Sequence, residues 1–118
     1  MNADLDIFSD GYVAFVKEDC PTCLLIEPVL SRLAKSGQLN AVFSQDNKDF
    51  PALDITIDDS DLRLSFQHGI ETVPSLLKFQ DGVEVGRIVG WLKSEWENFC
   101  ESTDLCSESF QDFSPGCG

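Results

Sequence analysis

Hydrophobic and polar positions follow different periods in successive parts of the chain. Residues 12–16, "YVAFV", form a continuous apolar run that is typical of a strand buried on both faces. From Pro21 the apolar residues recur every three or four positions, which predicts an amphipathic helix ending at Gly37. Pro28 falls inside this helix and should kink it. Residues 39–45 predict a second strand, parallel to the first through a right-handed crossover.

The middle of the chain is ambiguous. Residues 53–57 alternate apolar and polar side chains as a short strand does, whereas Pro51 and several acidic residues favour a loop. Both interpretations stay open. Residues 60–68 predict a short helix with a Ser or Asp at its N-cap and a stop at Gly69.

The pattern sharpens again after residue 74. Two strand-like runs, residues 75–79 and 83–89, flank Asp81 and Gly82, and Asp-Gly between such runs is a strong hairpin signal. Residues 91–102 place apolar side chains at helical spacing and predict a final helix. The element order predicts the α/β class, with a mixed central sheet flanked by helices.

Residues 103–118 differ from the rest because they are Ser-rich and lack any period. We therefore expect one domain over residues 1–102 and a tail over residues 103–118. A disordered or loosely attached tail is one interpretation. Phe110 and Phe113 favour two others, in which the tail docks on the domain or leads into a further domain.

Charge and length narrow the functional classes. The 118 residues carry a net charge of −13, from 21 acidic and 8 basic residues in no long block. Such a surface repels phosphate backbones and anionic lipids, so we expect neither nucleic acid nor membrane as a partner. No apolar run approaches the length of a membrane span, and residues 1–10 do not resemble a secretory signal. These features favour a cytoplasmic protein.

Two of the five cysteines, Cys20 and Cys23, are separated by only two residues at the predicted start of a helix. In a reducing cytosol a close pair is more often catalytic or metal-binding than structural. A helix N-terminus stabilises a thiolate, so Cys20 would attack a substrate disulfide and the more shielded Cys23 would resolve the mixed disulfide. Glu18 and Asp19 oppose a further negative charge there.

Zinc binding and inert structural thiols are the alternatives for this pair. A zinc site needs two more ligands, and His68 and the three other cysteines form no second close pair. His68 ends a predicted helix and has no identifiable catalytic partner, which favours a helix-end or surface role. The motif therefore favours redox chemistry, and we expect no metal or other cofactor.

The order of these motifs resembles the thioredoxin family over residues 5–102. The shared features are the strand, the helix opened by Cys-Pro-Thr-Cys, a proline five residues after the second cysteine, the Val73-Pro74 step, the Asp-Gly turn and Gly90 before the last helix. The resemblance implies a thioredoxin-like fold. Because only eleven residues precede Tyr12, it also implies a sheet that is shortened at its N-terminal side.

For the site, the resemblance implies a cis bond between Val73 and Pro74, facing the cysteine pair. Val73 and Pro74, with Pro21 and Thr22 between the cysteines, would then contact an extended substrate segment. Two positions depart from the family. Ala14 stands where typical members carry a buried acid, and Asp19 where they carry an aromatic residue.

The predicted activity is thiol–disulfide oxidoreduction, with reduction of protein disulfides favoured over oxidation. Its partners would be a disulfide-containing protein substrate and an electron-donor reductase. The alternative is a protein-binding module of a larger protein with little or no redox turnover, which Ala14 and the unusual tail favour. The fold alone does not choose between them.

The remaining cysteines and the tryptophans have simpler interpretations. Cys100 lies on the apolar stripe of the last helix, where a cysteine acts as a small hydrophobic residue. Trp91 and Trp96 are expected to pack in the core. Cys106 and Cys117 could pair with each other, serve as a second relay to Cys20, or be spare exposed thiols.

Overall fold

The structure is a computed structural model that describes residues 7–106 and 110–117. The strands are β1 (Gly11–Val16), β2 (Leu39–Ser44), β3 (Thr56–Asp58), β4 (Ser75–Gln80), β5 (Val83–Val89), β6 (Trp91–Leu92) and β7 (Phe113–Ser114). The helices are α2 (Pro21–Leu25), α3 (Glu27–Lys35), α4 (Arg63–Gln67) and α5 (Lys93–Phe99).

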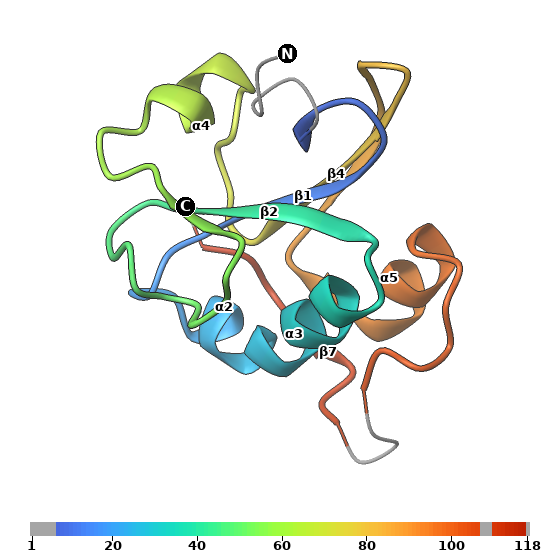
Figure 1. Cartoon of the computed structure of the whole chain (residues 1–118). Helices are drawn as coiled ribbons and strands as arrows, with labels where there is room; N and C mark the ends of the chain where they lie inside the picture. The colour runs from blue at the N-terminus through green and yellow to red at the C-terminus, as the bar shows by residue number, and fades with distance from the viewer. Residues whose placement is uncertain (1–6, 107–109, 118) are drawn as a thin grey trace.

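Five strands form one mixed sheet in the order β3-β2-β1-β4-β5. Strand β1 is parallel to β2 and antiparallel to β4, as the α/β prediction requires. Helix α4 lies on one side of this sheet, and α2, α3 and α5 lie on the other (Figure 1). Since both faces are covered, β1 is buried almost throughout, which explains its unbroken apolar run.

The long helix predicted after the cysteines is divided in two, as the kink expected from Pro28 suggests. Helix α2 ends at Leu25, and Pro28 lies in the first turn of α3, where its missing N–H leaves no helical hydrogen bond unmade. Ile26 joins the two helices, since its N–H donates to Thr22 O and its O accepts from Leu30 N. Helix α2 is thereby connected directly to α3 through hydrogen bonds of Ile26.

In the ambiguous region, the strand interpretation is correct for Thr56–Asp58, which pair with β2 in parallel. The predicted start of the next helix was wrong. Helix α4 begins at Arg63 after Leu62, which adopts a left-handed φ of 61° and provides no side-chain cap. The buried carboxylate of Asp59 takes over the cap by accepting hydrogen bonds from two backbone N–H groups in the first turn of α4.

The predicted hairpin is confirmed. Strands β4 and β5 are antiparallel, and the turn between them places Asp81 at φ 53° and Gly82 at φ 81°. Two successive positive φ values are the signature of a type I′ turn, whose twist matches that of the flanking strands. Asp-Gly is one of the few dipeptides that tolerate these angles, which is why this turn could be predicted from the sequence.

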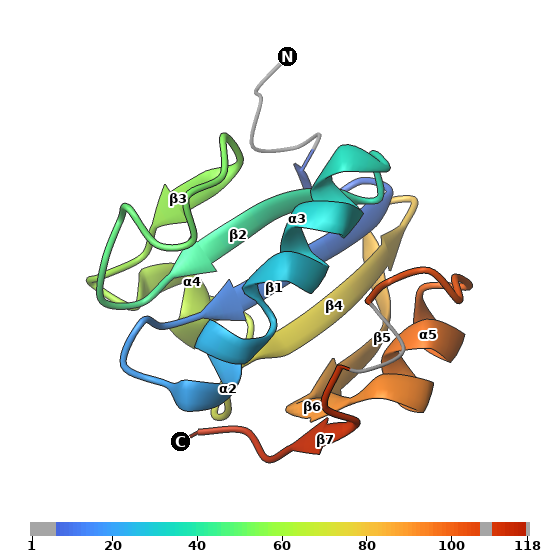
Figure 2. The ribbon, with the colours of Figure 1, turned by 90° about the horizontal axis from the view of Figure 1, so that it is seen from below.

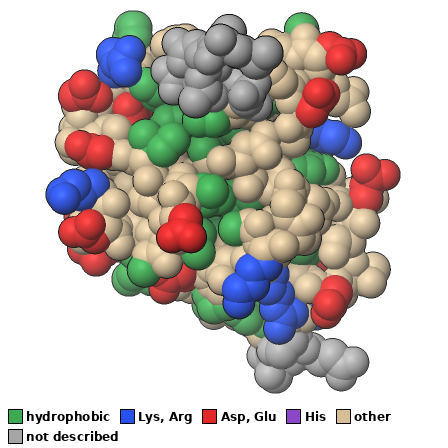
Figure 3. Space-filling model, in the orientation of Figure 1, with side chains coloured by type: hydrophobic (Ala, Val, Ile, Leu, Met, Phe, Trp, Pro, Cys, Tyr) green, Lys and Arg blue, Asp and Glu red, His purple; other side chains and the backbone are tan. Residues whose placement is uncertain are grey.

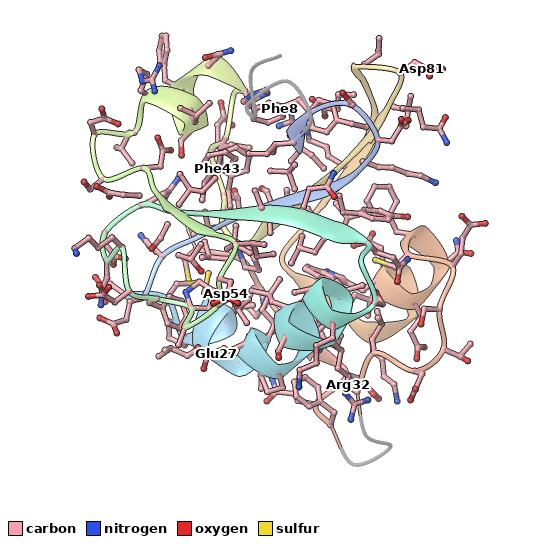
Figure 4. The ribbon with its side chains drawn as sticks, viewed as in Figure 1. Phe8, Glu27, Arg32, Phe43, Asp54 and Asp81 are labelled. Carbon is pink, nitrogen blue, oxygen red and sulfur yellow. The ribbon has the colours of Figure 1, made fainter. Side chains whose placement is uncertain are left out.

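Aromatic side chains fill the space between the sheet and α4. Phe8 stacks on Phe43 with ring centroids 5.9 Å apart, and both rings lie on the α4 side of β2 (Figure 4). His68 stacks on Phe8 at 4.9 Å and forms the C-cap of α4, so the predicted helix-end position is confirmed. Its ring is partly buried in this cluster, and desolvation lowers its pKa. The imidazole therefore belongs to the packing of the fold.

On the opposite side of the sheet, Trp91, Trp96 and Cys100 are buried, as predicted. The Trp96 indole N–H donates to Gly90 O at 2.9 Å, so this ring is satisfied as well as packed. Burial raises the pKa of the Cys100 thiol to about 12. Cys100 is therefore a core residue and not a reactive thiol at neutral pH.

Residues 110–117 of the tail lie against the rest of the molecule. Strand β7 lies beside β6 and pairs with it antiparallel (Figure 2). Cys117 forms an isolated bridge with Val73. Residues 107–109 and 118 of the tail lie outside the described residues. So do residues 1–6, on which part of the expected N-terminal shortening of the sheet falls.

The distribution of charged side chains on the surface agrees with the sequence, in which neither sign forms a long block. Acidic and basic side chains are scattered over the face in Figure 3, and no basic patch dominates it. Within the described ranges, no helix combines the length and apolar character needed to cross a membrane.

Candidate functional site

The loop after β1 ends at Cys20, the N-cap residue of α2, and Cys23 lies in the first turn of that helix. The carboxylate of Asp46 accepts hydrogen bonds from the backbone N–H groups of Glu18 and Asp19, at 2.7 and 2.9 Å. Cys20 then adopts the extended conformation of an N-cap, and Pro21 takes the first helical position. The end of β1 and the Asp46 carboxylate therefore fix the place of Cys20.

Cys20 and Cys23 come together as the sequence predicted. The Cys23 N–H donates to Cys20 Sγ at 3.4 Å, so the first sulfur caps the helix that carries the second. Only 1% of the Cys20 surface is exposed, and Cys23 is fully buried. Burial is the largest cause of a pKa of Cys23 raised far above the ordinary thiol value, with smaller contributions from Cys20 and Cys117. Cys23 is thus a thiol, not a thiolate, at neutral pH.

Val73 and Pro74 lie across from the cysteines, although Val73 is 53 positions from Cys20 in the chain. The bond between them is cis, as the resemblance implied. Val73 O lies 3.8 Å from Cys20 Sγ. Pro74 O accepts a hydrogen bond from Gly90 N, which anchors this turn to the end of β5. The backbone of Val73 therefore forms one wall beside the nucleophile candidate.

Of the two residues between the cysteines, only Thr22 is buried. Its hydroxyl donates to Pro115 O at 2.5 Å and lies 2.6 Å from Ser114 Oγ. Pro21 is exposed at the mouth of the site. Thr22 therefore contacts a peptide segment at the site, namely the tail.

Cys117 also lies at the site, and the sequence predicted its contacts there only in part. Its Sγ lies 2.7 Å from Cys20 Sγ. Its backbone N–H and C=O make both hydrogen bonds of an antiparallel bridge with Val73, at 2.7 and 2.8 Å. A relay to Cys20 was one of three interpretations of Cys117. The only sequence signal for it was the presence of an additional cysteine in the tail, within Pro-Gly-Cys. Nothing in the sequence pointed to the contacts of Ser114 and Pro115.

Ala14 is fully buried in β1 and offers no acidic group to the site. None of the groups that shift the pKa of Cys23 is a carboxylate. In the part of the chain that the structure describes, no group of three or more His, Cys, Asp or Glu side chains could hold a metal ion.

The chain matches no family model. Solved structures with the same fold include Chlamydomonas reinhardtii thioredoxin f2, with a TM-score of 0.61 and 20% identity over 88% of this chain and 89% of that one. The thioredoxin of Malassezia sympodialis, Mala s 13, has a TM-score of 0.60 and 14% identity over 81% of this chain and 78% of that one. At these identities the comparison establishes a thioredoxin-like fold and nothing finer.

Proposed function

We propose that this thioredoxin-like chain is a thiol–disulfide oxidoreductase that acts on protein disulfides, with Cys20 as the nucleophile and Cys23 as the resolving thiol. The observation that carries the proposal is the grouping of three elements at one place. These are the Cys20 sulfur, the Cys23 N–H hydrogen-bonded to it, and the backbone of Val73, whose carbonyl oxygen lies 3.8 Å from that sulfur. This arrangement suits an extended peptide whose disulfide must meet a thiolate.

In the first step an extended substrate segment pairs with the N–H and C=O of Val73, in the manner of an added strand. The Cys20 thiolate attacks one sulfur of the substrate disulfide. A new bond joins Cys20 to the substrate, and the other substrate sulfur leaves as a thiolate. Pro21 and Thr22 lie beside Cys20 in the chain, and with Cys20 and Val73 they form the binding surface for the segment, which we call the groove.

In the second step the Cys23 sulfur attacks Cys20 and releases the reduced substrate. Cys23 must first lose its proton, and burial keeps its pKa high. Because Ala14 supplies no acid or base here, this step is slow at neutral pH and accelerates as the pH rises toward the pKa of Cys23. The protein then carries a Cys20–Cys23 disulfide, which an electron-donor reductase must reduce. Such a cycle requires a reducing compartment such as the cytoplasm.

The test is the reduction of insulin disulfides in the presence of dithiothreitol. Cys20→Ser should abolish the activity, whereas Cys23→Ser should accumulate a mixed disulfide between Cys20 and the substrate. Cys106→Ser is the matched control, since this residue has no contact with the cysteine pair among the hydrogen bonds of the site. Normal turnover by the Cys20→Ser protein would refute the proposal.

A second function is binding of an extended peptide in the groove without redox turnover. The buried Ala14 favours it, because this residue supplies no acid or base for the resolving step. The same experiment separates the two functions. A binding module would retain its affinity for a peptide strand after Cys20→Ser and would reduce no insulin before it.

A further inference from the structure

The groove that the proposed function assigns to a substrate is filled by the chain itself. Residues 111–117 approach it along a continuous path, which starts where Gln111 O accepts the indole N–H of Trp91 at 2.6 Å. The path continues as β7 beside β6 and then runs past α2 (Figure 2). It ends at Cys117, which pairs with Val73. Each step is a defined backbone or side-chain contact, so this segment is docked and not merely adjacent.

The contacts of the docked segment are those expected of a bound substrate strand. Cys117 uses both backbone groups of Val73, at 2.7 and 2.8 Å. Ser114 and Pro115 use the only hydroxyl between the two cysteines, that of Thr22. The Cys117 sulfur meets Cys20 Sγ at 2.7 Å, where a substrate sulfur would be attacked. No other segment could pair with Val73 while this one is in place.

The fit of the segment depends on Gly116. A Cβ atom at this position would overlap Cγ2 of Thr72, and it would lie 3.0 Å from Val73 O and 3.5 Å from Gly90 Cα. Any larger residue would therefore push the segment away from the groove. The tail therefore carries glycine at a position where the body leaves no room for a Cβ atom.

We propose that Cys117 is a third redox-active cysteine, and that residues 113–117 form a resident substrate strand that competes with external protein disulfides for Cys20. This inference rests on the proposed function, because it requires Cys20 to be the nucleophile of the site. It extends that function by naming an intramolecular partner.

The exchange step balances without an additional oxidant. An external disulfide first oxidises the protein, which leaves Cys20 bonded either to the substrate sulfur or to Cys23, while the substrate gains the electrons. The Cys117 thiol loses its proton to the solvent, and the resulting thiolate attacks Cys20 Sγ. The Cys20–Cys117 bond forms, the previous bond of Cys20 breaks, and the displaced sulfur takes up a proton. The number of disulfides is unchanged in this step.

Disulfide mapping tests the exchange directly. The reduced full chain is treated with oxidised glutathione, quenched in acid, alkylated, digested and analysed by mass spectrometry. We expect a Cys20–Cys117 disulfide in the unmodified protein, and as the main product in the Cys23→Ser variant, where glutathione is the displaced sulfur. Cys117→Ser should remove this product, and Cys106→Ser should leave it unchanged.

The outcomes separate this inference from the proposed function. A Cys20–Cys23 disulfide without any Cys20–Cys117 disulfide, in the unmodified protein and in Cys23→Ser, would overturn the inference alone. If Cys20 formed no disulfide with any partner, both the proposed function and the inference would fail.

Competition is tested with Gly116→Ala, which alters the tail and leaves the proposed catalytic residues untouched. If the groove is open in about one molecule in ten, releasing the tail should lower the KM for insulin about tenfold, with kcat little changed. Gly86→Ala is the matched control, because its Cβ would also be crowded, at 3.1 Å from Phe99, but far along β5. Thr72→Ser in the Gly116→Ala chain removes the overlapping methyl group and should raise KM again. An unchanged KM in Gly116→Ala would overturn the competition.

Discussion

The hydroxyl of Thr22 provides the sharpest test of how strongly the tail is held. It donates to Pro115 O at 2.5 Å and is paired with Ser114 Oγ at 2.6 Å. Thr22→Val replaces this hydroxyl with a methyl group and removes both hydrogen bonds. The rest of the groove, including the Val73 bridge, is left in place.

The expected effect follows from those two bonds. A neutral hydrogen bond contributes about 0.5 to 1.5 kcal/mol net, so two contribute about 1 to 3 kcal/mol to docking. This corresponds to a change of about 5- to 150-fold in the equilibrium between the docked and the released tail. Ser114→Ala removes one of the two bonds from the tail side and should have about half the effect in free energy.

The assay is the effective concentration of Cys117 toward Cys20. It is measured in the Cys23→Ser background as the fraction of Cys20–Cys117 disulfide at equilibrium with mixtures of reduced and oxidised glutathione. A more firmly docked tail holds Cys117 near Cys20 for more of the time and raises this value. Thr22→Val should lower it by the factor given above.

A second threonine of the chain is a well-matched control. The Thr56 hydroxyl also donates to a proline carbonyl, Pro51 O, at 2.6 Å, but on β3 and without any contact to the tail. Thr56→Val should leave the effective concentration unchanged. The reasoning is refuted if Thr22→Val changes this concentration less than about twofold, or if Thr56→Val lowers it equally.

Two further predictions concern the scaffold. Asp59 is buried and accepts hydrogen bonds from Leu64 N and from the N–H and hydroxyl of Ser65, at 2.6 to 2.9 Å. Asp59→Ala should therefore lower the free energy of unfolding in urea by about 3 to 5 kcal/mol, and Asp59→Asn by less; a loss below about 1 kcal/mol would contradict the capping role. Tyr12 is the only tyrosine, and burial, followed by the charges of Cys100 and Glu101, raises its pKa to about 12. In a spectroscopic titration, the tyrosinate absorbance of the folded protein should therefore appear near pH 12. The stability that the neutral phenol contributes is complete below about pH 10 and should be lost as the pH rises toward 12. A titration midpoint near pH 10 in the folded protein would contradict this.

Local patterns were enough to predict most of the elements that carry the site. The apolar run of β1, the proline after the cysteine helix and the Asp-Gly turn each act within a few residues, through backbone hydrogen bonds or fixed dihedral angles. The resemblance to thioredoxins then linked two such patterns, Cys-Pro-Thr-Cys and Val73-Pro74, which the structure brings to one place. The cap of α4 was missed because the capping carboxylate belongs to Asp59, which precedes the N-cap residue Leu62 in the chain. The left-handed turn at Leu62 that brings Asp59 to the helix is not predicted by residue propensities.

The sequence by itself determined the α/β class, the strands β1, β2, β4 and β5, and the position of the cysteine pair at the start of a helix, because periodicity and turn chemistry act over short distances. It left β3 open, placed Trp91 and Leu92 of β6 in the last helix, and did not predict β7. Only the tertiary structure decided where the tail lies. The contact between Cys20 and Cys117 joins residues 97 positions apart, and it depends on one bridge to Val73, two hydrogen bonds to Thr22 and the absence of a side chain at Gly116. The tail has no hydrophobic period that would predict its structure locally. Its docked position depends on contacts with residues far away in the sequence, so it could not be predicted before the fold was known.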